Sequence, residues 1–307
     1  MRKLDGDLSQ CGKIFVHFPG GSRLSVSRKE SIAIDHLIRA SLPPKTVTAI
    51  VSNIGIKAGW SSIFNPNAGT DTAVIDVALV SKDHRHYSTA QAIKHLEPIV
   101  RKHFENTIFL FKASGIVQDL LSRGRITPVI IEIHGDHYQS SMLFAKRLAG
   151  TVRALPGVLS SNVFQRPHYP ALKIDVDRTL GKILGTEEDE VAKNVQVSLN
   201  SNNAIRPIPW IDPVTGFFYY LSVMYPPEKF TRMEDLTNLP VAHTQKGSIT
   251  YLGELARVTH QDIPEEIDHD RLDRAIDVLV APSPGESIQI SDRINRLLKK
   301  TSIFKAG

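Results

Sequence analysis

Two acidic residues, Asp175 and Asp177, stand two positions apart in the stretch "LKIDVDRTLGKILG", residues 172–185. Carboxylates at this spacing can hold a divalent metal for sugar or phosphoryl transfer, or they can form the wet side of a strand. Side chains alternate between the two faces of a strand. The inward set is then Leu172, Ile174 and Val176, and the outward set is Lys173, Asp175 and Asp177. No third ligand stands nearby, so the pattern favours an ordinary strand over a metal-dependent transferase.

Two pairs of histidines also have metal-ligand spacing, His134 with His137 in "HGDH" and His84 with His86 in "HRHY". Zinc usually takes four ligands, with His and Cys prominent in structural sites. The first pair flanks a turn, the second lies in a polar loop, and neither has an obvious partner elsewhere in the sequence. The single cysteine, Cys11, excludes a four-cysteine zinc site and an internal disulfide. We therefore interpret both pairs as surface residues and expect no bound metal.

Composition and the remaining motifs give no sign of catalysis. The chain of 307 residues is 41% hydrophobic and 22% charged, with a net charge of +5 that is spread along it. Nucleic-acid binders usually concentrate basic residues on one face, and no such block is present. Neither a phosphate-binding loop nor a Gly-x-Ser-x-Gly nucleophile elbow occurs. We expect neither an enzyme nor a cofactor.

The sequence carries no segment typical of a membrane helix. A spanning helix needs roughly 20 predominantly apolar residues, and the richest run, "FFYYLSVMY" at 217–225, is much shorter and is typical of a strand. The first ten residues have basic side chains but no following apolar stretch, unlike a secretory signal. As written, the chain is expected to be soluble and to lack an export signal.

The order of predicted elements in residues 13–114 is βαββαβ, which is the ferredoxin-like pattern. Ser88 and Gln91 fit a capping box at the start of one helix. Apolar and β-branched runs predict the strands, and helical spacing of apolar residues predicts the helices. The predicted strands are 13–18, 46–55, 73–80 and 107–112, and the predicted helices are 27–41 and 88–104.

The same pattern starts again after residue 126 but is interrupted. Residues 126–165 supply one βαβ half, and residues 268–305 supply the other, with a predicted helix at 287–300 and a predicted last strand at 301–305. Between them, residues 172–256 form an insert with strands of its own and a helix near 187–199. The fold class is therefore α+β, with two ferredoxin-like subdomains of which the second is interrupted by an inserted α+β subdomain.

Motifs distributed along nearly the whole chain resemble one family, the transporters of the resistance–nodulation–division (RND) superfamily that export acriflavin and other drugs. Single tetrapeptides are weak signals, but their order and spacing over some 290 residues make the combination specific. The matching segments are "FPGGSRLSVSRKE", "VSNIGI", "ALPGVLSSNVFQRPHYPALKIDVDRTLGKILG", "VAKNVQVSLNS", "MEDLTNLPV" and "ITYLGELARV".

The resemblance implies that the chain corresponds to the periplasmic loop between the seventh and eighth membrane helices of such a pump. That loop holds two porter subdomains and an inserted docking subdomain, at the periplasmic face of the bacterial inner membrane. The expected partners are amphiphilic drug-like molecules, other subunits of a homotrimer, a periplasmic adaptor and an outer-membrane channel, with no nucleic acid. Without the membrane helices, the chain alone is not expected to transport.

The resemblance also points to four aromatic residues as substrate-binding candidates. Trp60 and Phe64 lie in a Gly-rich connection, which in the family lies in the substrate cleft. Phe109 and Phe111 alternate on the strand "TIFLFK", whose aromatic residues the family also places in the cleft. The alternative for this second pair is that one or both phenylalanines belong to the core.

Two other functions stay open, a stand-alone ferredoxin-like binding module and, with less support, a metal-dependent transferase that uses Asp175 and Asp177. Ferredoxin-like units also serve as stand-alone RNA-binding or small-molecule-binding modules, and the RNA-binding kind displays aromatic and basic side chains on exposed strands. "TIFLFK" is the single candidate strand for that role, and its neighbours are apolar. Copper or silver export, which in the superfamily uses clustered methionines, is disfavoured because only Met142, Met224 and Met233 follow Met1.

Overall fold

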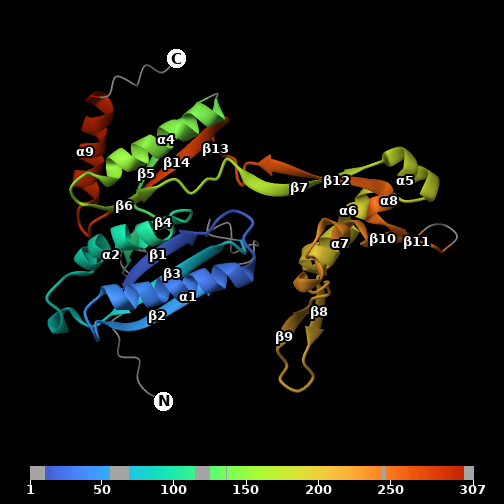
Figure 1. Cartoon of the computed structure of the whole chain (residues 1–307), viewed down its shortest axis with the longest axis horizontal. Helices are drawn as coiled ribbons and strands as arrows, with labels where there is room; N and C mark the ends of the chain where they lie inside the picture. The colour runs from blue at the N-terminus through green and yellow to red at the C-terminus, as the bar shows by residue number, and fades with distance from the viewer. Residues whose placement is uncertain (1–10, 56–68, 115–124, 136, 244–246, 301–307) are drawn as a thin grey trace. The chain divides into compact units, whose positions relative to one another are not determined.

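The structure is a computed structural model that describes residues 11–55, 69–114, 125–135, 137–243 and 247–300 (Figure 1). The described chain divides into two compact units. One unit contains residues 1–169 and 263–307, and the other, here called the inserted unit, contains residues 170–262. The inserted unit extends beyond the predicted insert, residues 172–256, at both ends of the range.

The first subdomain is a four-stranded antiparallel sheet with two helices, in the predicted order βαββαβ. The strands lie in the order β2-β3-β1-β4, so that the first strand of the sequence is central. Figure 1 shows α1 and α2 packed on the same face of this sheet. The elements are β1 (Cys11–His17), α1 (Leu24–Ser41), β2 (Val47–Ile54), β3 (Thr72–Leu79), α2 (Thr89–His103) and β4 (Ile108–Ser114), with a short 3-10 turn η3 (Lys82–His84).

The start of α2 confirms the capping box. The backbone N–H of Gln91 donates to the Ser88 hydroxyl at 3.2 Å, and the backbone N–H of Ser88 donates to the Gln91 side-chain oxygen at 2.7 Å. These two bonds satisfy donors that the first turn of a helix otherwise leaves unpaired. The helix then buries Ile93, Leu96 and Val100 against the sheet.

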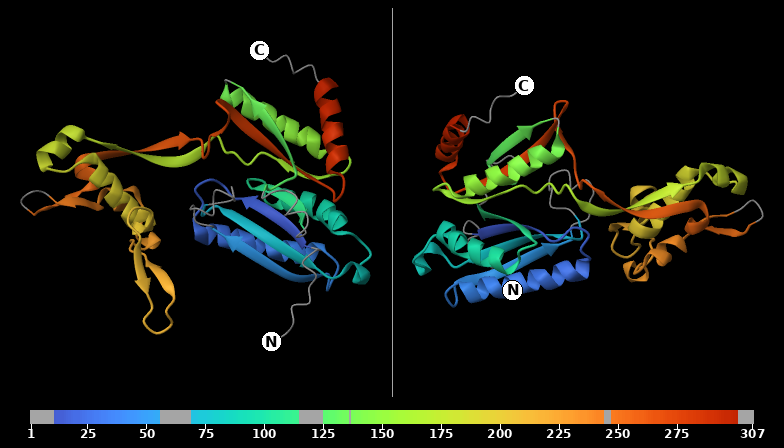
Figure 2. Two further views of the ribbon diagram at one scale, coloured as in Figure 1. Left: turned by 180° about the vertical axis from the view of Figure 1, so that it is seen from behind. Right: turned by 45° about the horizontal axis from the view of Figure 1, so that its top comes forward.

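The second subdomain is built from segments separated by the inserted unit. Strand β14 pairs antiparallel with β5 along one edge and with β6 and β13 along the other. Helices α4 and α9 cover one face, where they enclose Met142, Val152 and Ile290 (Figures 1 and 2). The elements are β5 (Val129–His134), α4 (Tyr138–Arg153), β6 (Val158–Asn162), β13 (Asp268–Asp270), β14 (Asp273–Pro282) and α9 (Ser287–Lys300). The predicted last strand, 301–305, lies outside the described residues.

The helix-free faces of the two sheets meet through an apolar cluster. Phe15 and Leu110 of the first sheet pack with Leu279 of the second and with Phe164, which follows β6. Because both sheets are apolar on this side as well as on their helix side, residues of the central strands are buried from both directions.

The inserted unit has its own core, formed by Val191, Leu236, Leu252 and Leu255 among others. Its long antiparallel pair, β7 with β12, joins it to the rest of the chain. None of the helices in the described ranges is long and apolar enough to cross a membrane. The elements are β7 (Tyr169–Val176), α5 (Arg178–Leu184), α6 (Glu188–Asn200), η4 (Asn202–Ala204), β8 (Ile208–Ile211), β9 (Phe218–Leu221), η5 (Pro227–Lys229), α7 (Met233–Thr237), β10 (Pro240–His243), β11 (Ile249–Tyr251), α8 (Leu252–Leu255) and β12 (Ala256–Ile263).

Candidate functional site

The acidic pair Asp175 and Asp177 has structural roles in the inserted unit. Asp177 is the N-cap of α5, and its carboxylate accepts hydrogen bonds from the backbone N–H of Thr179 at 2.9 Å and of Leu180 at 3.0 Å. Asp175 is exposed at the end of β7, 3.8 Å from the Lys173 ammonium group. The outward positions expected for both carboxylates are therefore present, and hydrogen bonding explains Asp177 without a metal.

One residue of that strand departs from the prediction. Leu172, expected to point inward with Ile174 and Val176, is 43% exposed, whereas the other two pack against the core of the inserted unit. Simple alternation fails here because the pattern of burial slips by one position within β7: Tyr169 and Ala171 are half-buried in its first half, and Ile174 and Val176 in its second.

The four predicted substrate-binding aromatics divide into two cases. Trp60 and Phe64 lie outside the described residues. Phe109 and Phe111 are both 0% exposed, lie in the core cluster beneath α1 and α2, and have ring centroids 5.9 Å apart. This placement favours the core alternative for the second pair, because a fully buried ring offers no surface to a ligand.

The strand that carries these phenylalanines is also fixed through its backbone. The carbonyl of Phe109 accepts hydrogen bonds from the guanidinium of Arg101 at 2.8 Å and from the Asn162 amide at 3.2 Å. Asn162 ends β6, so this carbonyl links the first subdomain to the second. Movement of Phe109 would break both bonds.

The four histidines of the two pairs are all exposed. His84 and His86 are exposed at and after the turn η3, and His137 is the exposed N-cap of α4 without a side-chain capping bond. His134, however, has the partner that sequence reasoning did not find. Its Nε2 atom lies 3.9 Å from Oδ2 of Asp270, on the β13–β14 hairpin.

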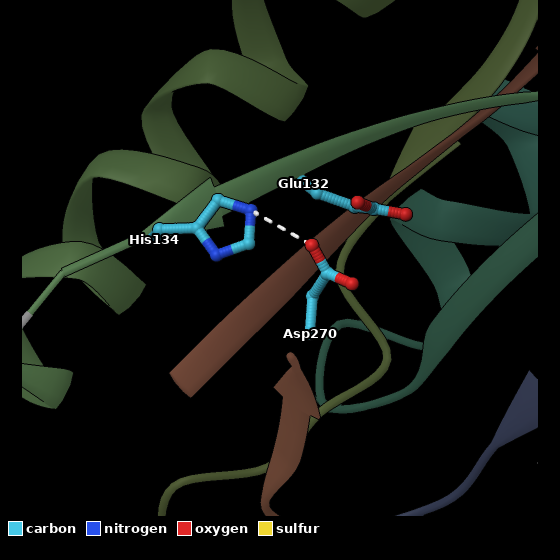
Figure 3. A group of neighbouring side chains, drawn as sticks. All are labelled: Glu132, His134 and Asp270. Atoms are coloured by element: carbon cyan, nitrogen blue, oxygen red, sulfur yellow. Dashed lines mark ion pairs between the residues drawn. The ribbon is translucent and has the colours of Figure 1, made fainter. Parts of the chain in front are cut away.

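Glu132 completes a carboxylate–histidine cluster with these two residues (Figure 3). One ligand atom of each of Glu132, His134 and Asp270 lies within 4.8 Å of the others, and all three side chains are exposed. Glu132 and His134 are two residues apart on β5 and so share a face. The alternation Glu-x-His was visible in the sequence, but nothing in it pointed to Asp270.

Another carboxylate lies next to this cluster. Asp277 pairs in register with Glu132 across β14 and β5. Burial, and then the negative charges of Glu132 and Asp268, raise the pKa of Asp277 to about 6. Burial, followed by the charges of Asp268, Glu265 and Asp277, raises the pKa of Glu266 to about 7. The carboxylate of Asp277 therefore lies beside Glu132, and Arg125 is near enough to oppose its charge in part.

A second prominent surface lies on the inserted unit. The hairpin of β8 and β9, here called the aromatic hairpin, exposes all eight of its strand residues. Trp210 and Tyr219 are cross-strand partners on one face, with ring centroids 6.0 Å apart. Phe218 and Tyr220 lie on the opposite face, with centroids 4.9 Å apart. Both faces of this hairpin are thus apolar and exposed.

The fold consists of two α+β subdomains, of which the second is interrupted by an insert, and comparison with known proteins assigns the family. The family model of the AcrB/AcrD/AcrF family matches residues 12–305. The chain therefore belongs to this family of RND efflux transporters.

Solved structures with the same fold include two crystal forms of a heavy metal efflux pump. The match to form II has a TM-score of 0.72 and a sequence identity of 15%, and it covers 97% of this chain and 30% of the pump chain. The match to form I has a TM-score of 0.72 and a sequence identity of 16%, and it covers 95% of this chain and 29% of the pump chain. The chain thus spans less than a third of the length of these pumps. No curated protein sequence matches.

Proposed function

We propose that this chain provides porter and docking subdomains on the periplasmic side of an RND efflux pump. In this proposal the pump is a homotrimer, and the inserted unit contacts neighbouring subunits and faces a periplasmic adaptor and an outer-membrane channel. Family membership over residues 12–305 supports the class of protein. The observation that carries the docking role is the exposed aromatic hairpin.

The hairpin exposes about half of the surface of each of its large aromatic side chains. Trp210 is 50% exposed, Phe218 is 54% exposed and Tyr219 is 50% exposed. An isolated two-stranded hairpin is marginally stable at best, and contiguous exposed apolar patches usually mark interaction sites. Because both faces of the hairpin are apolar, a flat partner surface would cover one face and leave the other exposed to water. A groove that receives the hairpin as an arm would cover both.

We assign that groove to a neighbouring pump subunit. The test uses sedimentation velocity of the 307-residue chain over a range of concentrations. We expect association at high concentration and a blue shift of Trp210 emission as it becomes covered. The double variant Trp210→Ser with Phe218→Ser removes one aromatic from each face and should abolish association.

The matched control is Leu272→Ser, since Leu272 is an apolar residue that is 93% exposed in the other unit. It should leave association unchanged. A chain that stays monomeric throughout, or an association that the hairpin variant does not affect, contradicts the docking role of the hairpin.

For the cargo, we propose amphiphilic drug-like molecules that contact Trp60 and Phe64. Large aromatic side chains supply apolar contact area with few fixed polar contacts, which suits many unlike ligands. The burial of Phe109 and Phe111 supports restricting the site to the first pair. A cationic amphiphilic dye should bind weakly, with a Kd on the order of tens of micromolar. Trp60→Ala with Phe64→Ala should weaken binding several-fold at unchanged Tm, whereas unchanged binding contradicts this site.

Divalent metal ions are a second candidate cargo. The carboxylate–histidine cluster favours it, and the two structural matches are described as heavy metal efflux pumps. Soft monovalent copper or silver stays disfavoured, because Cys and Met are the ligands that select such ions and Met142 is buried in the core of the second subdomain.

A further inference from the structure

We propose that Glu132, His134 and Asp270 form an exchangeable binding site for a divalent cation of the zinc type. As a binding site it rests on these three residues alone. Its use in transport would rest in addition on the proposed function of the chain. Zn²⁺ binding is measured on the chain by itself, so the failure of the site is distinguishable from the failure of the proposed function.

The fold brings the three ligands together from two elements. Strand β5 places Glu132 and His134 on one face by alternation, opposite the face that Ile131 and Ile133 turn toward the helices. The β13–β14 hairpin supplies Asp270, which pairs with Asp273 where the hairpin closes. The backbones are fixed by sheet pairing, whereas the exposed side chains are free to adjust.

The distances between the ligand atoms fit a site that can close on an ion. Zinc bonds to nitrogen and oxygen ligands are about 2.0–2.2 Å long, so two ligand atoms on one ion are at most about 4.4 Å apart. The three ligand atoms of the cluster now lie within 4.8 Å of one another. The 3.9 Å between His134 and Asp270 is longer than a hydrogen bond. A small rotation of exposed side chains therefore completes the coordination.

The ligand types select the class of cation. One imidazole and two carboxylates suit zinc and neighbouring divalent ions, whereas magnesium and calcium prefer oxygen ligands throughout. Three protein ligands leave at least one position for water, as in zinc sites that exchange or react. The carboxylate of Asp277, which pairs in register with Glu132, adds negative charge beside the site, and Arg125 lies near enough to oppose it in part.

Isothermal titration of the metal-free 307-residue chain with Zn²⁺ at pH 7.5 tests the site. We expect one ion per chain. His134→Ala should weaken binding at least about tenfold, the scale on which even supporting residues of metal sites act. Glu132→Gln and Asp270→Asn, which keep side-chain shape and remove charge, should each weaken it in the same direction. Co²⁺ provides a second readout, through visible absorption bands that His134→Ala should abolish.

His269→Ala is the matched control, because His269 is an exposed histidine of the same strand β13 adjacent to Asp270 and pointing to the other face. It should leave affinity unchanged. Thermal unfolding without metal shows whether each variant folds, and substitutions at these exposed positions should leave that Tm nearly constant. Absence of Zn²⁺ binding, or binding that persists undiminished in His134→Ala, overturns the proposal.

Discussion

The guanidinium of Arg166 lies 3.1 Å from the carboxylate of Asp71, and both side chains are almost completely buried. Asp71 precedes β3 in the first subdomain, and Arg166 follows β6 in the second. The same guanidinium pairs with Glu265 at 2.5 Å and donates to the carbonyl of Phe18 at 2.8 Å. Glu265 lies just after the chain returns from the inserted unit. One cation thus joins three segments far apart in the sequence.

Removing this cation should destabilise the unit strongly. Arg166→Ala leaves the Asp71 carboxylate buried without its partner, and breaking a buried pair in this way typically costs about 3–5 kcal/mol. The free energy of unfolding, measured by denaturant titration, should fall by that amount. The double variant Arg166→Ala with Asp71→Asn should recover part of the loss, because residue 71 then carries no buried charge. A loss below about 1 kcal/mol for Arg166→Ala would contradict the role of Arg166 as a buried link.

Phe109→Ala should cost about 3–5 kcal/mol in the free energy of unfolding, because a buried aromatic leaves a cavity when truncated. The control is Val51→Ala on the same sheet, where the side chain is 55% exposed and the cost should stay within about 0.5 kcal/mol. Denaturant titration gives both values. A small cost in stability for Phe109→Ala, together with reduced dye binding, would instead indicate that Phe109 lies in the substrate cleft.

The two aspartates of the inserted unit should respond differently to the same substitution. Asp177→Ala removes the cap of α5 and should cost about 0.5–2 kcal/mol, whereas Asp177→Asn keeps a good cap and should cost little. Asp175→Ala should change stability by less than about 0.5 kcal/mol. Mg²⁺ or Mn²⁺ should not shift the Tm of the parent chain. A metal-dependent rise in Tm that Asp175→Asn with Asp177→Asn abolishes would instead support a metal site at this pair.

The raised pKa of Glu266 predicts a pH dependence with a definite sign. The pKa of this group rises from 4.5 to about 7, mainly through burial. Between these values the folded chain binds more protons than the unfolded chain, so this group lowers stability as pH increases. Glu266→Gln should therefore raise Tm at pH 8 and change it little at pH 4.5.

The control for this prediction is Glu105→Gln, at an exposed glutamate in the first subdomain. It should leave the difference in Tm between the two pH values as it is in the parent chain. If Glu266→Gln lowers Tm at pH 8, its carboxylate is stabilised by the fold, and the inferred sign is wrong.

Local patterns in the sequence were sufficient for most of the secondary structure. The helix 287–300 was predicted with the same bounds that α9 has, and the Ser88–Gln91 capping box is present because it depends on residues three apart. The βαββαβ order followed from the alternation of period-2 and helical patterns. Interactions between residues close together in the sequence determine these features, so they can be predicted without knowledge of the tertiary structure.

Only the tertiary structure decided which residues meet. Asp270 reaches His134 because β13, β14 and β5 lie side by side after the chain has passed through the inserted unit. Phe109 and Phe111 are buried because α2 packs over their strand and the core of the first subdomain surrounds their rings, which a six-residue pattern of alternating aromatics does not specify. The sequence by itself determined the elements, their order and the family resemblance. Packing over long sequence separations determined the cation cluster, the Arg166 link and the exposure of each aromatic, because those depend on contacts that no local pattern encodes.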